Sequence, residues 1–466
     1  MESSAVFHPP ALEPISRLDQ LAEADWRLAD LRRRAREFRE RFIEPVAADL
    51  DREMLLDPER RADDLLRHGC EYGFLSLVVP AFVRGAGGLA LQSAVLLEEL
   101  SAGCAGISNL FGAHYLGISG LLMGVDVSLF DTLLREVADE EKRGVPVVFA
   151  AALTEPMAGS DVEDQELLPL AKIVSSARKV PGGYVLNGRK VFISNGSIAR
   201  YTLVVCPLDQ RHPLETWSAF VVPSGTPGFT VARVERKMGQ RACHAAELVF
   251  EDCFVPERLR VGVEGRGMDV TDLVLAASRG PVAAIATGIG RGAYEKALAY
   301  ARREGLLDRQ WAQLALADML SRVELGRCRY LEAAQRFDGT VARALLGPPG
   351  LLDAAMRLVG PVRRSPLGQR LVATGSFKRL TSRLHERIDS RVRARSWGLS
   401  SMAKFTCSDL AVEVCLRALE MLGPAGAEER AGVEKHLRDA KLTQIYEGTN
   451  QLNRLATFKA LVREVA

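Results

Sequence analysis

Residues that build metal and disulfide sites are scarce in this chain. Its seven histidines are dispersed, and its eight cysteines include no CxxC pair. Scattered cysteines are typical of reduced, mostly buried thiols, so the sequence predicts neither a disulfide framework nor a metal site. Cys243 and His244 are the one adjacent pair, and we assign it no metal or redox role.

A strong net charge and long apolar runs are also missing. The formal net charge is +2, which gives no global attraction to nucleic acid. Charges or glycines interrupt each apolar stretch before the ~20 residues that a membrane span needs. The first residues include acids and prolines, where a signal or transit peptide would be basic and apolar. We therefore expect a soluble cytoplasmic protein without membrane contact.

The pattern of apolar and polar residues changes twice along the chain. Apolar residues recur at spacings of three and four from Leu18 to about Gly144, and again after Gly267, which is typical of helices. Between Val147 and Gly262 short β-rich runs alternate with glycine and proline. The sequence predicts an N-terminal helical domain over residues 1–146, a middle β domain over 147–262 and a C-terminal helical domain over 263–466.

Two segments of the middle region carry local signals. The apolar run 149–153 stops at Thr154 and turns through Ala-Gly-Ser-Asp at 158–161, which predicts a strand followed by a loop of hydroxyls and free amides. Such a loop suits an anionic or heteroaromatic ligand. Further on, Asn187-Gly188 lies between two β-rich runs and predicts a hairpin turn there.

Near the C-terminus, the segment 438–451 places Glu447 between a tyrosine and a glycine. Surface glutamates normally lie among polar residues on a solvated helix face, and this one does not. One interpretation is a helix end capped by Gly448. The other is a carboxylate held in place for chemistry.

The motifs resemble those of the acyl-CoA dehydrogenases, flavoproteins that make an α,β double bond in an acyl thioester. LTEPxAGSD is matched at 153–161, NGxKxxIxN at 187–195 and R-D-A-K-x-x-x-I-Y-E-G-T-x-Q at 438–451. The resemblance implies an α+β multidomain fold: an N-terminal α-helical domain, a middle β-barrel or sandwich and a C-terminal helical bundle. It also implies FAD between the last two, and a homodimer or homotetramer that completes the flavin site.

The resemblance assigns roles residue by residue. Glu447 is the catalytic base, and Tyr446 and Arg279 are tentative substrate contacts. The cofactor-binding residues are Thr154, Ser160, Phe192, Ser194, Thr449 and Gln451. Serine and threonine in turns often bond their own backbone instead, and Arg279 could simply pair with a carboxylate at a helix end. Some relatives take their base from the position of Ser278, which is not acidic here.

Two departures from the family bear on flavin binding. After Glu304 the chain lacks the family's R-x-x-F-G segment, for which Arg302, Arg303 or Arg309 could substitute as cations. The family's Q-x-x-G-G-x-G turn is replaced by a segment with Glu420 and a proline at 424, which adds a negative charge and removes a backbone donor. Both changes predict weaker or altered flavin binding.

A third departure is a basic insertion over about 338–396. Its cations are Arg363, Arg364, Arg370, Lys378, Arg379, Arg383, Arg387, Arg391, Arg393 and Arg395. It could be a solvated helical hairpin or loop, a docking surface for an anionic partner, or a nucleic-acid-binding surface. Nucleic acid is the weakest of these, because few aromatic residues interrupt the charges.

The sequence therefore predicts α,β-dehydrogenation of an acyl thioester in fatty acid metabolism. Glu447 acts as the base, FAD accepts the hydride, and an electron-transfer flavoprotein or similar acceptor reoxidises it. One alternative is a dehydrogenase acting on an acyl-carrier-protein thioester. The other is a flavin-deficient scaffold or nucleic-acid-binding relative that uses the basic insertion.

Overall fold

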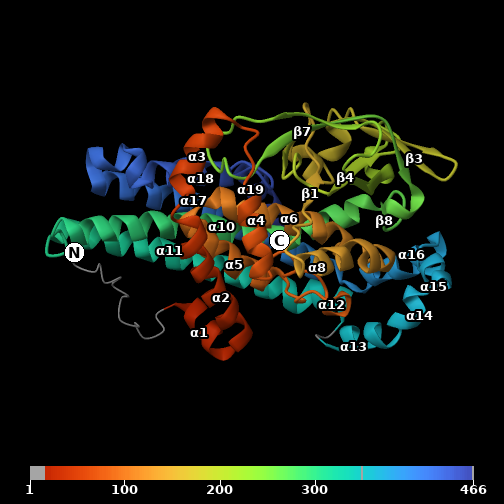
Figure 1. The fold of residues 1–466 in the computed structure, drawn as a ribbon, viewed down its shortest axis with the longest axis horizontal. Helices are drawn as coiled ribbons and strands as arrows, with labels where there is room; N and C mark the ends of the chain where they lie inside the picture. Colours follow the sequence, from red (N-terminus) through yellow and green to blue (C-terminus); the bar gives the residue numbers. More distant parts are fainter. Residues whose placement is uncertain (1–15, 348–349, 464–466) are drawn as a thin grey trace.

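The computed structural model describes residues 16–347 and 350–463. Two groups of helices, one from each end of the chain, pack together, and the strands lie along one side of them (Figure 1). The N-terminal helices are α1 (Arg17–Ala24), α2 (Trp26–Phe38), α3 (Ala47–Leu56), α4 (Asp63–Glu71), α5 (Ala90–Gly103), α6 (Ala105–Met123), α7 (Val127–Leu129) and α8 (Arg135–Glu141).

The middle of the chain forms two four-stranded sheets. The first has the order β1-β4-β5-β8 and the second β2-β3-β7-β6. The strands are β1 (Phe149–Ala152), β2 (Ser176–Val180), β3 (Gly183–Ser194), β4 (Tyr201–Pro207), β5 (Trp217–Pro223), β6 (Phe229–Val234), β7 (Ala245–Pro256) and β8 (Arg260–Val261), with the short helix α9 (Pro213–Thr216) between β4 and β5.

The predicted hairpin turn at Asn187-Gly188 is wrong. Strand β3 runs straight through both residues, and the β2–β3 hairpin turns earlier, at residues 181–182. At Gly188 the pairing with β7 shifts register as a bulge. The Asn187 side chain exchanges two hydrogen bonds with Asp252 across this bulge, at 2.9 and 3.2 Å. An Asn-Gly pair supports positive φ in a bulge as well as in a turn.

Helices return at Gly267. The long ones are α10 (Gly267–Arg303), α11 (Gln310–Phe337) and α17 (Ser390–Leu422), followed by α18 (Val433–Thr443) and α19 (Asn450–Phe458). Between α11 and α17 lie α12 (Arg343–Leu346), α13 (Leu351–Leu358), α14 (Gly360–Arg364), α15 (Pro366–Val372) and α16 (Gly375–Ser382). The predicted fold class is confirmed, with helical ends and a middle sheet domain.

Helix α10 is the centre of the molecule, packed on α5, α6, α11 and α17. Among the described residues it is the one helix long and apolar enough to cross a membrane, but 89% of its most apolar window is buried in the fold. Buried glycines allow this close packing, since a Cβ at Gly288 would come within 2.3 Å of a backbone oxygen of α5. Its apolar character is therefore that of a core helix.

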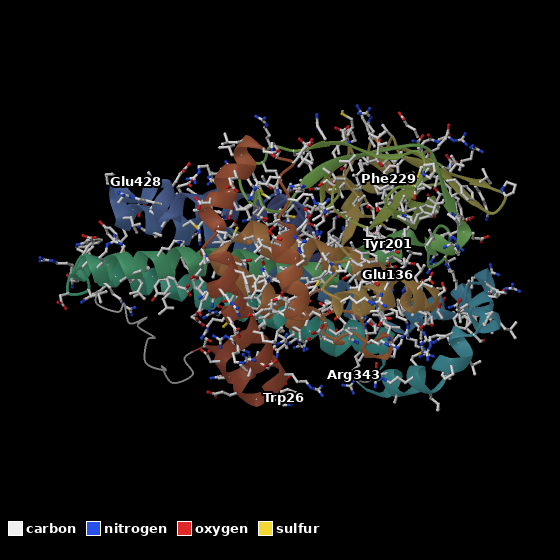
Figure 2. All side chains as sticks on the ribbon, in the orientation of Figure 1. Trp26, Glu136, Tyr201, Phe229, Arg343 and Glu428 are labelled. Carbon is white, nitrogen blue, oxygen red and sulfur yellow. The ribbon has the colours of Figure 1, made fainter. Side chains whose placement is uncertain are left out.

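Polar contacts fix the β domain on the helices. Figure 2 shows Glu136 of α8 beside Tyr201 of β4. The Tyr201 hydroxyl donates to Glu136 at 2.6 Å, and Arg200 pairs with the same carboxylate at 2.7 Å. This contact holds the start of β4, which pairs in parallel with β1 and so helps to place the loop that follows β1.

Two cations of the insertion anchor it and are not part of a basic surface. Arg363 is buried and paired with Asp131, and Lys378 is buried and lies 2.8 Å from Asp126. A buried charge needs such a partner because desolvation is otherwise expensive. The insertion is thus a set of short helices bound to the N-terminal helical domain, at one end of the molecule (Figure 1).

Candidate active site

Glu447 lies in a turn between two helices, not on a helix face. Helix α18 ends at Thr443 and α19 begins at Asn450. Glu447 has φ +56° and Gly448 has φ +74°, so two successive residues are left-handed. For a residue other than glycine this backbone costs about 1–3 kcal/mol, and it persists only where the surroundings enforce it. The turn aims the carboxylate inward.

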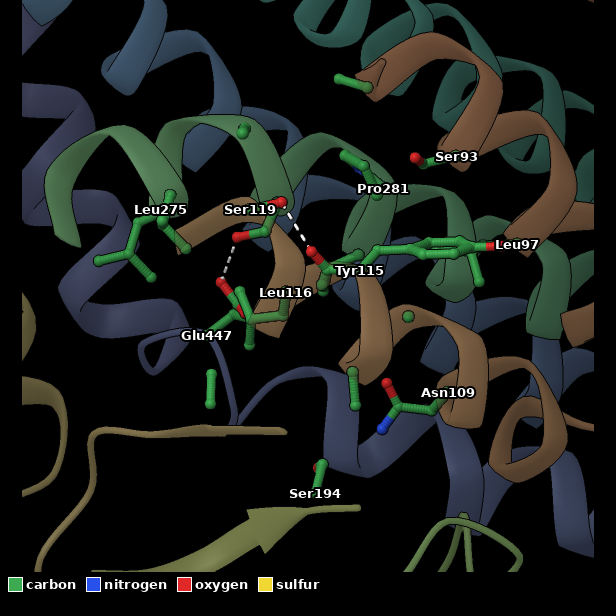
Figure 3. A pocket seen from close by; sticks show the side chains of 18 of the residues that line it. Ser93, Leu97, Asn109, Tyr115, Leu116, Ser119, Ser194, Leu275, Pro281 and Glu447 are labelled. Atoms are coloured by element: carbon green, nitrogen blue, oxygen red, sulfur yellow. Dashed lines mark hydrogen bonds between the residues drawn. The ribbon is translucent and has the colours of Figure 1, made fainter. Parts of the chain in front are cut away.

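The Glu447 carboxylate lines a cavity of about 160 Å³ between the helices and the β domain (Figure 3). Its walls come from α5, α6 and α10, and Leu116, Leu275 and Pro281 give it an apolar surface. Ser278 of α10 donates a hydrogen bond to Glu447 Oε2 at 2.8 Å. The position of Ser278, where some relatives carry their base, therefore holds a hydroxyl that orients the predicted base, Glu447.

Burial sets the acidity of Glu447. Removal from water, and then the nearby negative charge of Glu163, raise the pKa of Glu447 to about 7, against the Ser278 hydrogen bond and the charges of Arg279 and Lys404. The pKa of Lys404 falls to about 7, because burial and then Arg279 disfavour its cation. A carboxylate with a pKa near neutrality is suited to removing a weakly acidic proton.

Three of the predicted flavin contacts line this same cavity. Thr154, Phe192 and Ser194 come from the ends of β1 and β3 and line the cavity together with Glu447. The ring of Phe192 is 62% exposed although it borders the cavity, and its φ is +57°. A large exposed ring in a left-handed residue is an unusual arrangement that a flat aromatic ligand would cover.

The other three predicted contacts lie elsewhere. Ser160 accepts a hydrogen bond from the backbone N–H of Thr449 at 3.0 Å, which ties the loop after β1 to the turn of the base. The Thr449 side chain caps α19 by accepting from the Leu452 N–H at 3.2 Å. Gln451 is exposed, in a surface depression with Asp409. Their roles toward a flavin stay predictions.

The two tentative substrate contacts differ in position. Tyr446 lines the cavity, and its hydroxyl accepts from Gln240 at 3.2 Å. Arg279 is fully buried behind Ser278 and pairs with Glu163 at 3.1 Å. Its guanidinium also stacks on Trp397, 5.1 Å from the ring centroid. Arg279 thus pairs with a carboxylate, as the second interpretation of the sequence proposed.

The donor set fits an isoalloxazine ring. The lining of the cavity combines the hydroxyl residues Thr154 and Ser194, the exposed Phe192 and the carboxylate of Glu447. Flavin rings combine an apolar face with polar edges, which these groups match.

The cations predicted as substitutes for the missing segment, Arg302, Arg303 and Arg309, are exposed at the far tip of α10 and α11, where Arg303 pairs with Glu304 at 2.9 Å.

Glu163 is a residue of the site that the sequence interpretation missed. It follows the AGSD motif by two residues and is one of the residues that line the cavity. Nothing in the local pattern separates it from the other acids of that loop, Asp161, Asp164 and Glu166. Only its contact with α10, more than a hundred residues away, marks it out.

No metal site emerges from the geometry. Within residues 16–347 and 350–463 no group of three or more His, Cys, Asp or Glu side chains could hold a metal ion. Seven of the eight cysteines are buried as free thiols, and Cys328 is exposed.

Comparisons with known proteins give the family. The families described as acyl-CoA dehydrogenase N-terminal, middle and C-terminal domains match residues 27–127, 150–253, and 265–346 with 360–462. Cyclohex-1-ene-1-carbonyl-CoA dehydrogenase of Geobacter metallireducens is 33% identical over 91% of this chain and 94% of its own length. A short-chain-specific acyl-CoA dehydrogenase of Clostridium acetobutylicum is 28% identical over 91% and 95%.

Solved structures agree with the sequence matches. Butyryl-CoA dehydrogenase from Megasphaera elsdenii superposes with a TM-score of 0.74 at 26% identity, covering 93% of this chain and 98% of that one. The chain therefore belongs to the acyl-CoA dehydrogenase family, a class of flavoprotein oxidoreductases. The match to the C-terminal domain is interrupted only between residues 346 and 360, and it includes the rest of the predicted insertion at 338–346 and 360–396.

Proposed function

We propose that this protein is an FAD-dependent dehydrogenase that introduces an α,β double bond into an acyl thioester, with Glu447 as the base. The observation that carries the proposal is the Glu447 carboxylate, inside an apolar cavity and hydrogen-bonded to Ser278 at 2.8 Å. A buried carboxylate is expensive to maintain, and structural stability alone gives no reason for one there.

The residues of the chain would act as follows. The α proton of a thioester is weakly acidic, so a base must be held against it in a dry cavity. The left-handed turn fixes Glu447, and Ser278 fixes the rotation of its carboxylate. FAD, when bound, supplies the acceptor for the β hydride. Thr154, Ser194 and Phe192 would hold its ring opposite the base, which orients the substrate between the two.

The visible spectrum tests this proposal. The purified protein should show oxidised-flavin bands, and one member of a panel of acyl-CoA thioesters of graded length and branching should bleach them. The bleaching thioester also identifies the substrate class. A colourless protein that takes up no added FAD would contradict the proposal and favour the flavin-deficient alternative.

The pH dependence of kcat/KM follows from the acidity of the base. Glu447 must be ionised to take a proton, and its pKa is raised to about 7. We therefore expect kcat/KM to rise tenfold per pH unit below about pH 7 and to level off above it, measured from about pH 5.5 to about pH 9. A profile that stays flat down to about pH 5.5 would exclude a base of this acidity.

A second candidate concerns the carrier of the acyl group. Seven arginines of the insertion are exposed and have no ion pair within the described residues: Arg364, Arg370, Arg379, Arg383, Arg387, Arg391 and Arg395. Exposed aliphatic side chains lie among them, with Leu367 at 78% and Leu371 at 60% on the same helix as Arg370. An acidic carrier protein presents the complementary surface.

Charge reversal distinguishes the two carriers. The double variant Arg370→Glu/Arg379→Glu should lower kcat/KM for an acyl-carrier-protein thioester by about tenfold or more, with less loss at high salt. It should leave kcat/KM for the same acyl group on coenzyme A unchanged. Arg178→Glu, an exposed arginine of β2, is the control. Equal effects on both thioesters would contradict a carrier-protein docking surface.

A further inference from the structure

A second buried carboxylate lies beside the base and has no part in the mechanism above. Glu163 ends the short 3-10 helix Ser160–Glu163 and is 8% exposed. Its Oε2 accepts from Arg279 Nη2 at 3.1 Å. The same oxygen lies against the backbone of Gly448, since a Cβ added there would come within 2.9 Å of it, and the Gly448 N–H acts to lower the pKa of Glu163. Glu163 therefore touches the residue that follows the base.

The turn at Glu447 and Gly448 is held through both its carbonyl oxygens and its N–H groups. Asn453 donates to the Glu447 carbonyl oxygen at 3.2 Å, and Lys404 donates to the Gly448 carbonyl oxygen at 2.6 Å. Arg279 donates to the Glu447 carbonyl oxygen at 3.3 Å. These contacts satisfy the carbonyl side. On the N–H side of Gly448, the carboxylate of Glu163 is the group that faces the turn.

Charged groups face Glu447 from three elements. Glu163, from the loop after β1, is the negative one, and burial raises its own pKa. Arg279 of α10 and Lys404 of α17 are positive. Lys404 in turn feels the charge of Asp409. Removing the charge of Glu163 therefore leaves Arg279 and the protonated fraction of Lys404 beside Glu447 without an opposing anion, which favours the ionised form of Glu447.

We propose that Glu163 is a positioning residue for Glu447: it ties the left-handed turn to Arg279, with which it pairs, through its contact with Gly448. Its negative charge has a second consequence, because it acts to raise the pKa of Glu447. This assignment rests on the proposed function only for the role of Glu447 as the base. The contact and the charge effect are properties of the folded chain and can be measured without turnover.

The test is an infrared titration of the Glu447 carboxyl group. The protonated carboxyl band that disappears in Glu447→Gln belongs to this residue, and its midpoint is measured in each variant. In Glu163→Gln, which keeps an acceptor for Arg279 and loses the charge, the midpoint should fall by about one pH unit. The acid limb of kcat/KM should move to lower pH by the same amount.

Two further variants separate charge from contact. Glu163→Asp keeps the charge but withdraws it from Gly448, so the midpoint should stay near that of the wild type while kcat falls. Glu166→Gln removes an exposed carboxylate three residues further along the chain, which is paired with Lys459 at 2.9 Å. This variant should change neither the titration midpoint of Glu447 nor kcat. Circular dichroism and thermal melting establish that each variant is folded. If Glu163→Gln does not fold, Glu163→Asp still tests the contact, because it should lower kcat without displacing the midpoint.

An unchanged midpoint in Glu163→Gln would overturn the inference, whatever happens to turnover. So would a midpoint in Glu163→Asp displaced to lower pH as far as expected for Glu163→Gln. If the midpoints shift as expected and no thioester bleaches the flavin, the proposed function fails and the positioning role stands.

Discussion

If Glu447 is the base, we expect Glu447→Gln to lower kcat by about 10²–10⁴-fold, the usual contribution of a general base. The amide keeps the size of the carboxylate and can still accept from Ser278, which is 2.8 Å from Oε2 in the wild type. It cannot take a proton at neutral pH. The flavin spectrum and the binding of the thioester should therefore be retained, so that the loss falls on kcat and not on KM.

Stopped-flow bleaching of the flavin band measures this effect on the chemical step itself. Glu413→Gln is the matched control, because Glu413 is an exposed carboxylate of α17, paired with Arg322 at 2.9 Å and not among the residues that line the cavity. A decrease in kcat of less than tenfold in Glu447→Gln would show that another group removes the proton. Loss of the flavin would show a structural role instead.

Lys190→Met destabilises the fold by about 3–5 kcal/mol, the usual effect of leaving one half of a buried ion pair alone. Lys190 and Glu155 are fully buried, with 2.8 Å between Nζ and Oε1. Lys190 also donates to the Leu153 carbonyl oxygen at 2.8 Å, at the end of β1. Burial alone would raise the pKa of Glu155, but Lys190 and the hydrogen bonds from Ser175 and Val174 hold it below its usual value.

Urea unfolding at several pH values measures this prediction. In the wild type the lowered pKa of Glu155 stabilises the fold at pH values above the pKa that this group has in the unfolded chain. This contribution is lost as the pH falls through the lower pKa of the folded state. Without Lys190 the pKa of Glu155 rises, so the deficit of the variant should shrink as the solution is acidified. Lys179→Met is the control: its salt bridge to Glu264 is at the surface and contributes about 0–1 kcal/mol. Equal losses of unfolding free energy in Lys190→Met and Lys179→Met would contradict a special contribution of the buried ion pair.

Periodicity was enough to place the helices and strands in the right parts of the chain. The change to β runs after Gly144 and the return of helices at Gly267 are visible in the spacing of apolar residues, because that spacing reports local burial. The Asn-Gly pair at 187–188 was misinterpreted for a related reason. Its local preference for positive φ is real, and only the cross-strand partner Asp252 decides between a turn and a bulge.

The sequence also determined that Glu447 is the residue to examine, since a carboxylate between Tyr446 and Gly448 in that motif is unusual on a solvated helix. It could not show what surrounds that carboxylate. Ser278 and Glu163 are 169 and 284 positions away, and neither has a local pattern that sets it apart.

In the predicted insertion, likewise, the number of cations in the sequence did not show which of them are exposed. Arg363 and Lys378 looked like part of one basic surface and are buried against Asp131 and Asp126 of another domain. Periodicity separated helical from β regions, and the motifs, through the family that they resemble, predicted the fold class and the candidate base, because both signals lie in neighbouring residues. Only the tertiary structure decided the acidity of that base and which cations face solvent, because burial and long-range pairing set the free energy of every charge.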